Sequence, residues 1–544
     1  MQSNDFMNIY AQFKGQSNGN LALLDAPTGS GKSYGVVRFA CQKALTEKGF
    51  KLFFITDQKK NLHQEDFERA WIQTGGTKQS FWQRVAFIRS LEDTVDLIIS
   101  TWNLCLPADL KNDEVLMNYR QLNNAQLTYH TLKRMGIDST SGYSMLQKAE
   151  YEFRQAIENR LTVIAAKNIQ TSGDIKNGIR RYLATTDNSI SDWMNFVYPT
   201  VDLKQRQIFI LTTDKFIRSY TDFFAKKATN FLDSQVLHGA LVVLDEFDST
   251  KQRLLNKSID DSLKIKVDLL DLFTIIRQGL LKINQPDLPE KLLDTILPKV
   301  NFKEMLRTAN EDLSRFGLNY LYRTIDTEHN DNYLIHAPHY TLISSDKYWH
   351  SRLNAGGKTV EISPEVTDDL HFKTMLFQVA KFIRRFHQKI SWWAELYAKQ
   401  RNQATKTNEN GISLSDSCRS IYDALGIKGN QADVLLALEP RLGQRIKKQK
   451  LKGPNGYRKF QNQGLDLFYF INSEGHDLRT EIIAAFFAIT PERYLLSILS
   501  KANVLGLSAT ASVPTVLDNY DLDYLKEELG DNLFNGNQFL TNKT

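Results

Sequence analysis

Residues 26–33 read Ala-Pro-Thr-Gly-Ser-Gly-Lys-Ser, a spacing that suits the binding of a nucleoside triphosphate. Gly29 and Gly31 let the backbone curl so that successive N–H groups point at phosphate oxygens. Lys32 can reach the β- and γ-phosphates, and the Ser33 hydroxyl can complete the coordination shell of Mg²⁺. We therefore predict a phosphate-binding loop with ATP and Mg²⁺ as cofactors. The residues expected to bind them are Thr28, Gly29, Ser30, Gly31, Lys32 and Ser33.

The segments on either side of this loop have the patterns that such a loop requires. Leu21–Leu24 is a short apolar run that predicts a buried strand, and Tyr34–Leu45 predicts a helix. The N-terminus of that helix adds a partial positive charge beside the phosphates. The alternative is a chance Gly-Ser turn before a helix, and the combination of strand, loop and helix argues against it.

A second group of candidate residues is acidic. The apolar run 241–244 predicts a core strand, and Asp245-Glu246-Phe247-Asp248 follows it directly. We expect Asp245 to hold Mg²⁺, and Glu246 to orient or deprotonate the attacking water. The catalytic residues would then be Lys32, Asp245 and Glu246, and the metal would be held by Ser33 and Asp245. Without the upstream loop, a solvated acidic turn would be the preferred interpretation.

A third apolar run, 503–507, ends in Ser508-Ala509-Thr510. This tripeptide is common, but here it follows a predicted strand downstream of both other motifs. We predict that the hydroxyls of Ser508 and Thr510 bond to Asp248 and couple the state of the nucleotide to the rest of the protein.

The three motifs, in this order, resemble motifs I, II and III of a superfamily 2 helicase. Two weaker similarities extend the resemblance. The strand-like run 53–56 with residues 57–62 resembles motif Ia, whose loop touches nucleic-acid phosphates. Residues 208–216 resemble the strand and loop that help to grip the nucleic acid. The resemblance implies an ATP-dependent helicase or translocase, and a fold of class α/β with a RecA-like, mostly parallel sheet.

The spacing of the motifs predicts two insertions. Lys32 and Asp245 are 213 residues apart (245 − 32), and Asp245 and Ser508 are 263 apart (508 − 245). Apolar residues at helical spacing in 143–157, 261–281 and 376–401 indicate that both insertions are largely helical, with a polar β-like patch between 333 and 362. We predict RecA-like segments at 1–106, 201–250 and 488–530, a helical insertion at 107–200, an arch-like insertion at 251–487, and a polar tail or linker at 531–544.

This layout is similar to that of the XPD/DinG-like branch of these helicases, with two departures. In that branch the first insertion carries an iron–sulphur cluster, but residues 107–200 contain no cysteine, so we expect no cluster. The sequence given ends at Thr544, 34 residues after Thr510 (544 − 510). The resemblance implies a second RecA-like lobe that supplies further arginines to the ATP site, so we expect that lobe in cis or in trans, and weak hydrolysis without it.

Residues 441–459 form the strongest candidate for nucleic-acid binding, because they hold eight Lys and Arg side chains and no Asp or Glu. Basic groups along a phosphate track, with aromatic rings nearby for base stacking, are typical of single-strand binding. A solvated basic loop is an almost equal alternative, and the position of the segment within the second insertion slightly favours binding. The binding residues that we predict are Arg445, Lys447, Lys448, Lys450, Lys452, Tyr457, Arg458 and Lys459. The rings at Phe386 and Trp393 favour core packing over a base platform.

Composition limits the class of protein. The 544 residues suggest about three domains. The net charge of +6 is mild and alone says little about partners. The three cysteines have no paired spacing, so we expect no disulfide scaffold and a location in the reducing cytoplasm. No apolar run is long enough to span a bilayer, and we expect no membrane partner.

The function best supported by these motifs is a helicase or translocase motor lobe, acting on single-stranded DNA. An RNA-directed helicase shares every motif. The alternative from another class is a nucleotide-dependent binding module or switch for a partner protein, which would not unwind nucleic acid.

Overall fold

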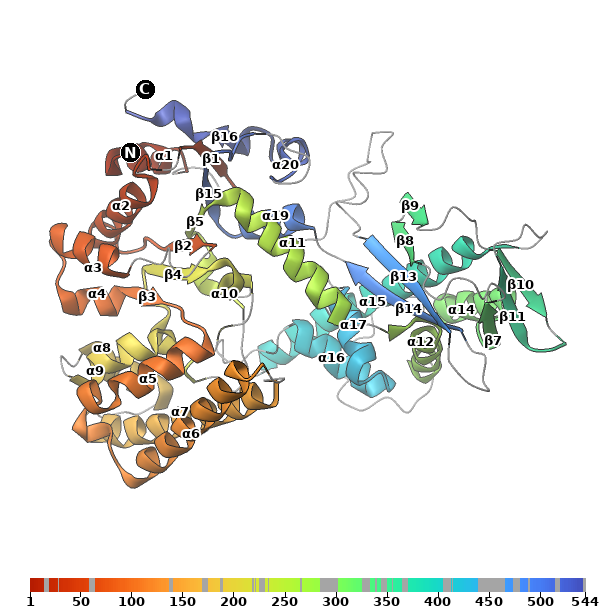
Figure 1. Ribbon diagram of the computed structural model, residues 1–544, viewed down its shortest axis with the longest axis horizontal. Helices are drawn as coiled ribbons and strands as arrows, with labels where there is room; N and C mark the ends of the chain where they lie inside the picture. Colours follow the sequence, from red (N-terminus) through yellow and green to blue (C-terminus); the bar gives the residue numbers. More distant parts are fainter. Residues whose placement is uncertain are drawn as a thin grey trace. The chain divides into compact units, whose positions relative to one another are not determined.

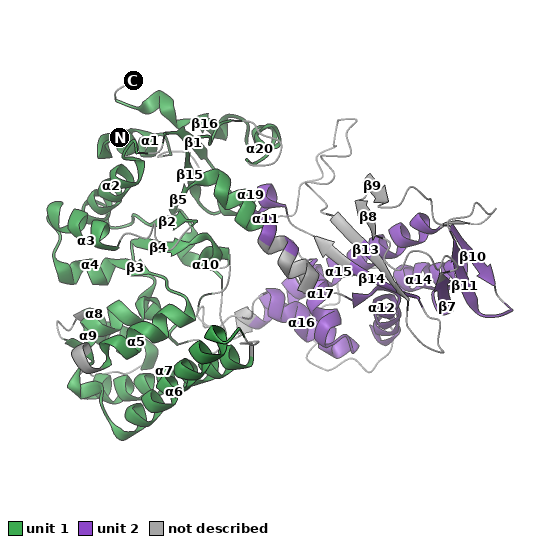
Figure 2. Cartoon of the chain, viewed as in Figure 1, with its two compact units in different colours: residues 1–254, 495–544 green, residues 255–494 purple. Residues whose placement is uncertain are grey.

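A computed structural model gives the structure of the chain (Figure 1). It describes all residues except 14–18, 28, 58–63, 137–139, 169–174, 186–188, 218–219, 221, 225–229, 233, 265–266, 284–301, 325–332, 338–339, 344–349, 355, 364–369, 405–411, 413, 439–464, 473–479, 488–489, 514–518 and 542–544. The chain divides into two compact units, 1–254 with 495–544, and 255–494 (Figure 2).

The first unit is built on a seven-stranded sheet of order β16-β1-β15-β5-β2-β4-β3 (Figure 1). Every neighbouring pair is parallel. The central strands are continuous apolar runs because both faces of a parallel sheet are covered. This α/β layout is compatible with a RecA-like domain. The strands are β1 (Leu21–Asp25), β2 (Leu52–Thr56), β3 (Val85–Phe87), β4 (Ile208–Thr212), β5 (Leu241–Asp245), β15 (Asn503–Ser508) and β16 (Leu533–Asn535).

Helices flank this sheet. Residues of α1 and α2, such as Phe6 and Val36, share one apolar core with Phe54 of β2, Val243 of β5 and Leu505 of β15. The helices of this unit around the sheet are α1 (Ser3–Phe13), α2 (Lys32–Thr46), α3 (Gln64–Gln73), α4 (Lys78–Arg84), α10 (Thr213–Ile217), the latter part of α19 (Pro491–Leu499) and α20 (Leu522–Leu529), with 3-10 turns η4 (Gln235–Leu237), η5 (Gly530–Asn532) and η6 (Gly536–Phe539).

Between β3 and β4 the described chain is helical and has its own core. Leu122, Phe153, Ile157 and Trp193 are among its buried members. The elements are α5 (Leu91–Cys105), η2 (Ala108–Leu110), α6 (Asp113–Arg134), α7 (Thr140–Asn168), α8 (Ile175–Thr185), α9 (Ser189–Val197) and η3 (Pro199–Asp202).

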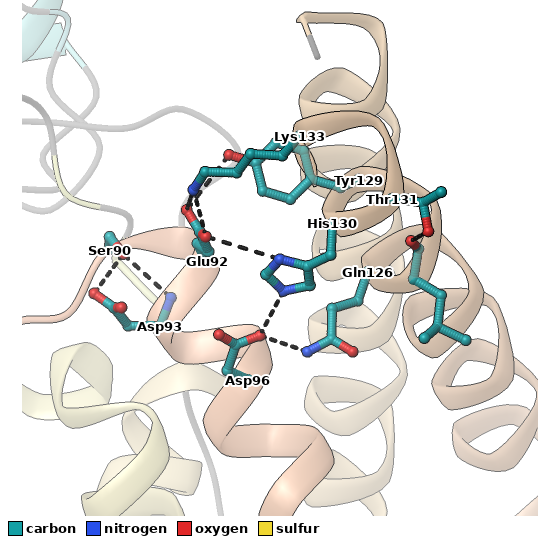
Figure 3. Close-up of polar contacts among 10 residues, drawn as sticks. Ser90, Glu92, Asp93, Asp96, Gln126, Tyr129, His130, Thr131 and Lys133 are labelled. Carbon is teal, nitrogen blue, oxygen red and sulfur yellow. Dashed lines mark hydrogen bonds and ion pairs between the residues drawn. The ribbon is translucent and has the colours of Figure 1, made fainter. Parts of the chain in front are cut away.

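A polar cluster joins α5 to α6 (Figure 3). The Lys133 ammonium donates to both oxygens of Glu92, at 2.8 and 3.1 Å. His130 Nε2 lies 3.2 Å from Asp96 Oδ1, and the Gln126 amide donates to the same oxygen. These contacts fix the first long helix of the segment against the helix that leaves the sheet.

The second unit combines helices with two small sheets. Its helices are the latter part of α11 (Phe247–Lys264), α12 (Leu269–Ile283), α14 (Phe302–Phe316), α15 (Phe372–Ala404), α16 (Leu414–Leu425) and α17 (Gly429–Ala437). One sheet has the order β12-β10-β11-β7 and the other β6-β14-β13-β8-β9. The strands are β6 (Val267–Asp268), β7 (Leu321–Thr324), β8 (Tyr333–Ala337), β9 (Tyr340–Ile343), β10 (His350–Asn354), β11 (Thr359–Ser363), β12 (Leu370–His371), β13 (Leu465–Asn472) and β14 (Thr480–Phe487).

Three elements differ from the sequence-based expectations. Residues 531–544, expected as a polar tail or linker, instead contribute β16, whose Leu533 pairs with Leu21 of β1. The helix expected over 261–281 is two helices, because Asp268 Oδ1 accepts the backbone N–H groups of residues 270 and 271 and so begins α12. The eight-residue strands β13 and β14 lie in a segment expected to be largely helical.

Among the helices that the structure describes, none is long and apolar enough to cross a membrane.

Candidate functional site

The loop between β1 and α2 has the backbone that its glycines predict. Gly29 has φ 84° and Gly31 has φ 77°, both in the left-handed region that side chains disfavour. The Ala26 N–H donates to the carbonyl of Ser508 at 2.9 Å, which ties the start of the loop to the end of β15. The loop is therefore curled and anchored to the neighbouring strand. Thr28, predicted to bind the cofactor, lies outside the described residues.

The structure brings Lys32 and Glu246 together. Lys32 Nζ donates to Glu246 Oε1 at 3.2 Å, with the lysine side chain 8% exposed and the glutamate 41% exposed. Glu246 has φ 60°, a left-handed conformation that costs about 1–3 kcal/mol for a residue other than glycine. The Glu246 carboxylate lies beside the loop lysine, so a phosphate held by Lys32 would lie close to this carboxylate.

Ser33 and Asp245 also converge. Ser33 Oγ lies 3.5 Å from Asp245 Oδ2, and Asp245 is buried at the end of β5. Mg²⁺ binds oxygen ligands at about 2.1 Å, and two of its neighbouring ligands are therefore about 3 Å apart. The two oxygens fit one ion, with small adjustments. The buried Ser30 Oγ has no hydrogen-bond partner among the described residues.

A search of the described residues finds no group of three or more His, Cys, Asp or Glu side chains that could hold a metal ion. A magnesium–nucleotide site does not need such a group, because phosphates and water complete the coordination shell.

The three predicted coupling residues form one hydrogen-bonded group. Thr510 Oγ1 donates to Asp248 Oδ2 at 2.7 Å. The Thr510 N–H donates to Ser508 Oγ at 3.2 Å, and the two hydroxyls are 3.4 Å apart. Asp248 lies in the first turn of α11, two residues after Glu246. The first turn of α11 is therefore hydrogen-bonded to the residues at the end of β15.

Sequence reasoning missed Asp25, the last residue of β1. Its Oδ1 accepts the Ser512 N–H at 2.8 Å, and its Oδ2 accepts the Ser512 hydroxyl. The side chain of Asn537 accepts the Asp25 N–H at 2.9 Å and donates to the Asp25 carbonyl at 2.9 Å. The chain after β16 thus clamps the strand that leads into the phosphate loop. An acidic residue directly before the loop was the only signal in the sequence.

A second missed contact lies at the end of β2, where motif Ia was expected. Asp57 accepts from Ser249 Oγ at 3.0 Å and from Arg253 Nε at 2.5 Å. Both partners are on α11. This helix is therefore tied to the ends of β15 and β2, on either side of β5. The next residues, 58–63, lie outside the described residues.

The basic residues predicted to bind nucleic acid, within 441–459, also lie outside the described residues. Phe386 and Trp393 are fully buried in the core of the second unit, as the sequence favoured.

No protein-family model matches this sequence, and no curated protein is significantly similar to it.

Proposed function

We propose that this chain is the first motor lobe of an ATP-dependent helicase or translocase that acts on single-stranded nucleic acid, with DNA as the substrate. One observation carries the proposal: the side chains of three motifs meet where β1, β5 and β15 end. Lys32 lies beside Glu246, Ser33 beside Asp245, and Thr510 beside Asp248. In the proposed site the loop around Lys32 cradles the phosphates, Asp245 holds the metal ion and Glu246 is the base. The contact between Thr510 and Asp248 connects these groups to β15.

Each group has a defined role in the proposed reaction. Loop N–H groups and Lys32 hold the β- and γ-phosphates in line for attack. Bound Mg²⁺, held by Ser33 and Asp245, would neutralise charge on the phosphate oxygens. Glu246 accepts a proton from the attacking water. The proposal includes a second RecA-like lobe, in cis or in trans, whose arginines complete the site, so hydrolysis by this chain alone is slow.

The contacts of α11 support a motor over an isolated phosphatase. Asp248 connects its first turn to Thr510, and Ser249 and Arg253 connect it to Asp57. A change at Glu246 therefore reaches the ends of two strands, one of which leads into the loop expected to contact nucleic acid. Such a two-sided connection supports a nucleotide-driven change in nucleic-acid affinity.

The test compares the wild-type chain with Glu246→Gln, which keeps the shape of the side chain and removes the base. We expect wild type to hydrolyse ATP slowly with Mg²⁺, and Glu246→Gln to bind ATP without turnover. The control is Glu528→Gln, an exposed change on α20 that should leave turnover unaltered.

Binding to a fluorescent single-stranded oligonucleotide, DNA or RNA, is then measured with and without a non-hydrolysable ATP analogue. The proposal expects nucleotide to change the affinity, more for DNA than for RNA. ATP binding with no effect on either nucleic acid would contradict the motor and favour a switch for a protein partner. A stronger effect on RNA would replace the DNA assignment.

A further inference from the structure

Tyr34, the residue directly after Ser33, has an exposed aromatic ring. Its side chain is 49% exposed, and it is one of the large hydrophobic side chains that the first unit leaves in contact with solvent. The Arg38 guanidinium lies over the ring, 5.7 Å from its centre. Arg38 is one turn further along α2, so the pair lies on one exposed helix face.

The other residues of this first turn are occupied by contacts. Gly35 is covered by α1, since a Cβ placed there would lie 2.6 Å from the ring of Phe6. Lys32 turns toward Glu246, and Ser33 turns toward Asp245. Tyr34 therefore marks the open side of the helix turn that holds the phosphates.

We propose that Tyr34, supported by Arg38, is the platform on which the base of the bound nucleoside triphosphate stacks. This inference rests on the proposed function, because it needs a triphosphate in the loop. A triphosphate held by Lys32 and Ser33 must extend its nucleoside out of the phosphate cradle, and Tyr34, directly after Ser33 in the first turn of α2, offers an exposed ring there. Arg38 lies over one face of that ring and leaves half of the side chain accessible.

The chemistry of the pair fits a nucleobase. Aromatic rings stack on the faces of bases, and a guanidinium beside the ring adds a cation–π contribution. Stacking acts on the π-face of any base, so the platform contributes affinity with little dependence on base identity.

The experiment measures the dissociation constants of ATP and of inorganic tripolyphosphate, both with Mg²⁺, for wild type, Tyr34→Ala and Tyr34→Phe. Tripolyphosphate reports on the phosphate loop alone. We expect Tyr34→Ala to weaken ATP binding about tenfold, as loss of one stacking partner does, and to leave tripolyphosphate binding unchanged. Tyr34→Phe should bind ATP as wild type does. Tyr143→Ala removes a comparably exposed tyrosine on α7 and should change neither constant.

Equal weakening of ATP and tripolyphosphate by Tyr34→Ala would overturn the platform, since the substitution would then act on the phosphate loop. Unchanged ATP binding by Tyr34→Ala would overturn it as well. A folded wild-type chain that binds neither ligand would instead overturn the proposed function, so the two failures are distinguishable.

Discussion

The hydrogen bond between Thr510 and Asp248 should carry part of the coupling between nucleotide and nucleic acid. Thr510→Val keeps the shape of the side chain and removes the donor, and Asp248→Ala removes the acceptor. A hydrogen bond to a charged group contributes about 1.5–3 kcal/mol. This one, at 2.7 Å, is exposed to solvent, so we reduce its contribution to about 1 kcal/mol. That energy corresponds to a factor of about five.

The assay is the ratio of single-strand affinities with and without a non-hydrolysable ATP analogue, measured by fluorescence anisotropy. Each single variant should reduce this ratio about fivefold. The double variant should reduce it by the same factor, because the two substitutions remove one interaction.

Thr541→Val provides a matched control, since Thr541 Oγ1 donates to Asp5 Oδ1 at 2.6 Å and neither residue belongs to the three motifs. It should lower the melting temperature and leave the affinity ratio unchanged. Independent effects that multiply to about twenty-fivefold in the double variant, or an unchanged ratio in both single variants, would refute the coupling role.

Two further predictions concern stability. Burial, with a smaller effect of the nearby Arg384 charge, lowers the pKa of His387 from 6.5 to about 3. Between these two values the imidazole is protonated in the unfolded chain and neutral in the folded chain. The free energy of unfolding should therefore fall as pH falls from 6.5 toward 3, by about 2 kcal/mol at pH 5. Urea unfolding at several pH values should show that His387→Gln lacks this pH dependence. An equal pH dependence in wild type and variant would contradict the role of His387. Arg206→Met should lower the free energy of unfolding by about 3 kcal/mol, because the buried guanidinium donates to the Pro199 carbonyl at 3.0 Å and to Asn195 Oδ1 at 2.7 Å. A loss under about 1 kcal/mol in the same assay would show that these acceptors find other partners.

Local patterns were enough to predict the core of the sheet and the residues at its edge. The apolar runs before Lys32, Asp245 and Ser508 are β1, β5 and β15, and these three strands are neighbours. The carboxyl ends of parallel neighbours lie at one edge, so residues that follow such strands must meet there. This rule, rather than any property of the individual tripeptides, made the site predictable.

The missed features depend on contacts that leave no local pattern. β16 pairs with β1 across most of the chain, and its residues, Leu533–Asn535, form only a three-residue edge strand. The Asp25–Asn537 clamp follows from the same pairing. The division of 261–281 into two helices could have been found, since Asp268 is a residue type that begins helices.

The runs that form β13 and β14 show a different difficulty. Residues 465–472 and 480–487 are mostly apolar segments of eight, a length at which strand and helix cannot be separated by periodicity alone. They pair with each other as antiparallel neighbours, and β13 also pairs with β8 in the patch that was expected to be β-like. Part of the pairing of β13 therefore comes from a strand far away in sequence, which leaves no local pattern.

The most direct test is to compare ATP hydrolysis by Lys32→Ala with hydrolysis by wild type and by Lys43→Ala. Lys43 is the control because it lies on the same helix but forms an ion pair with Glu47. We predict slow, Mg²⁺-dependent turnover by wild type and Lys43→Ala, and none by Lys32→Ala at an unchanged melting temperature. Turnover by Lys32→Ala equal to that of wild type would contradict the assignment of this loop as the ATP site.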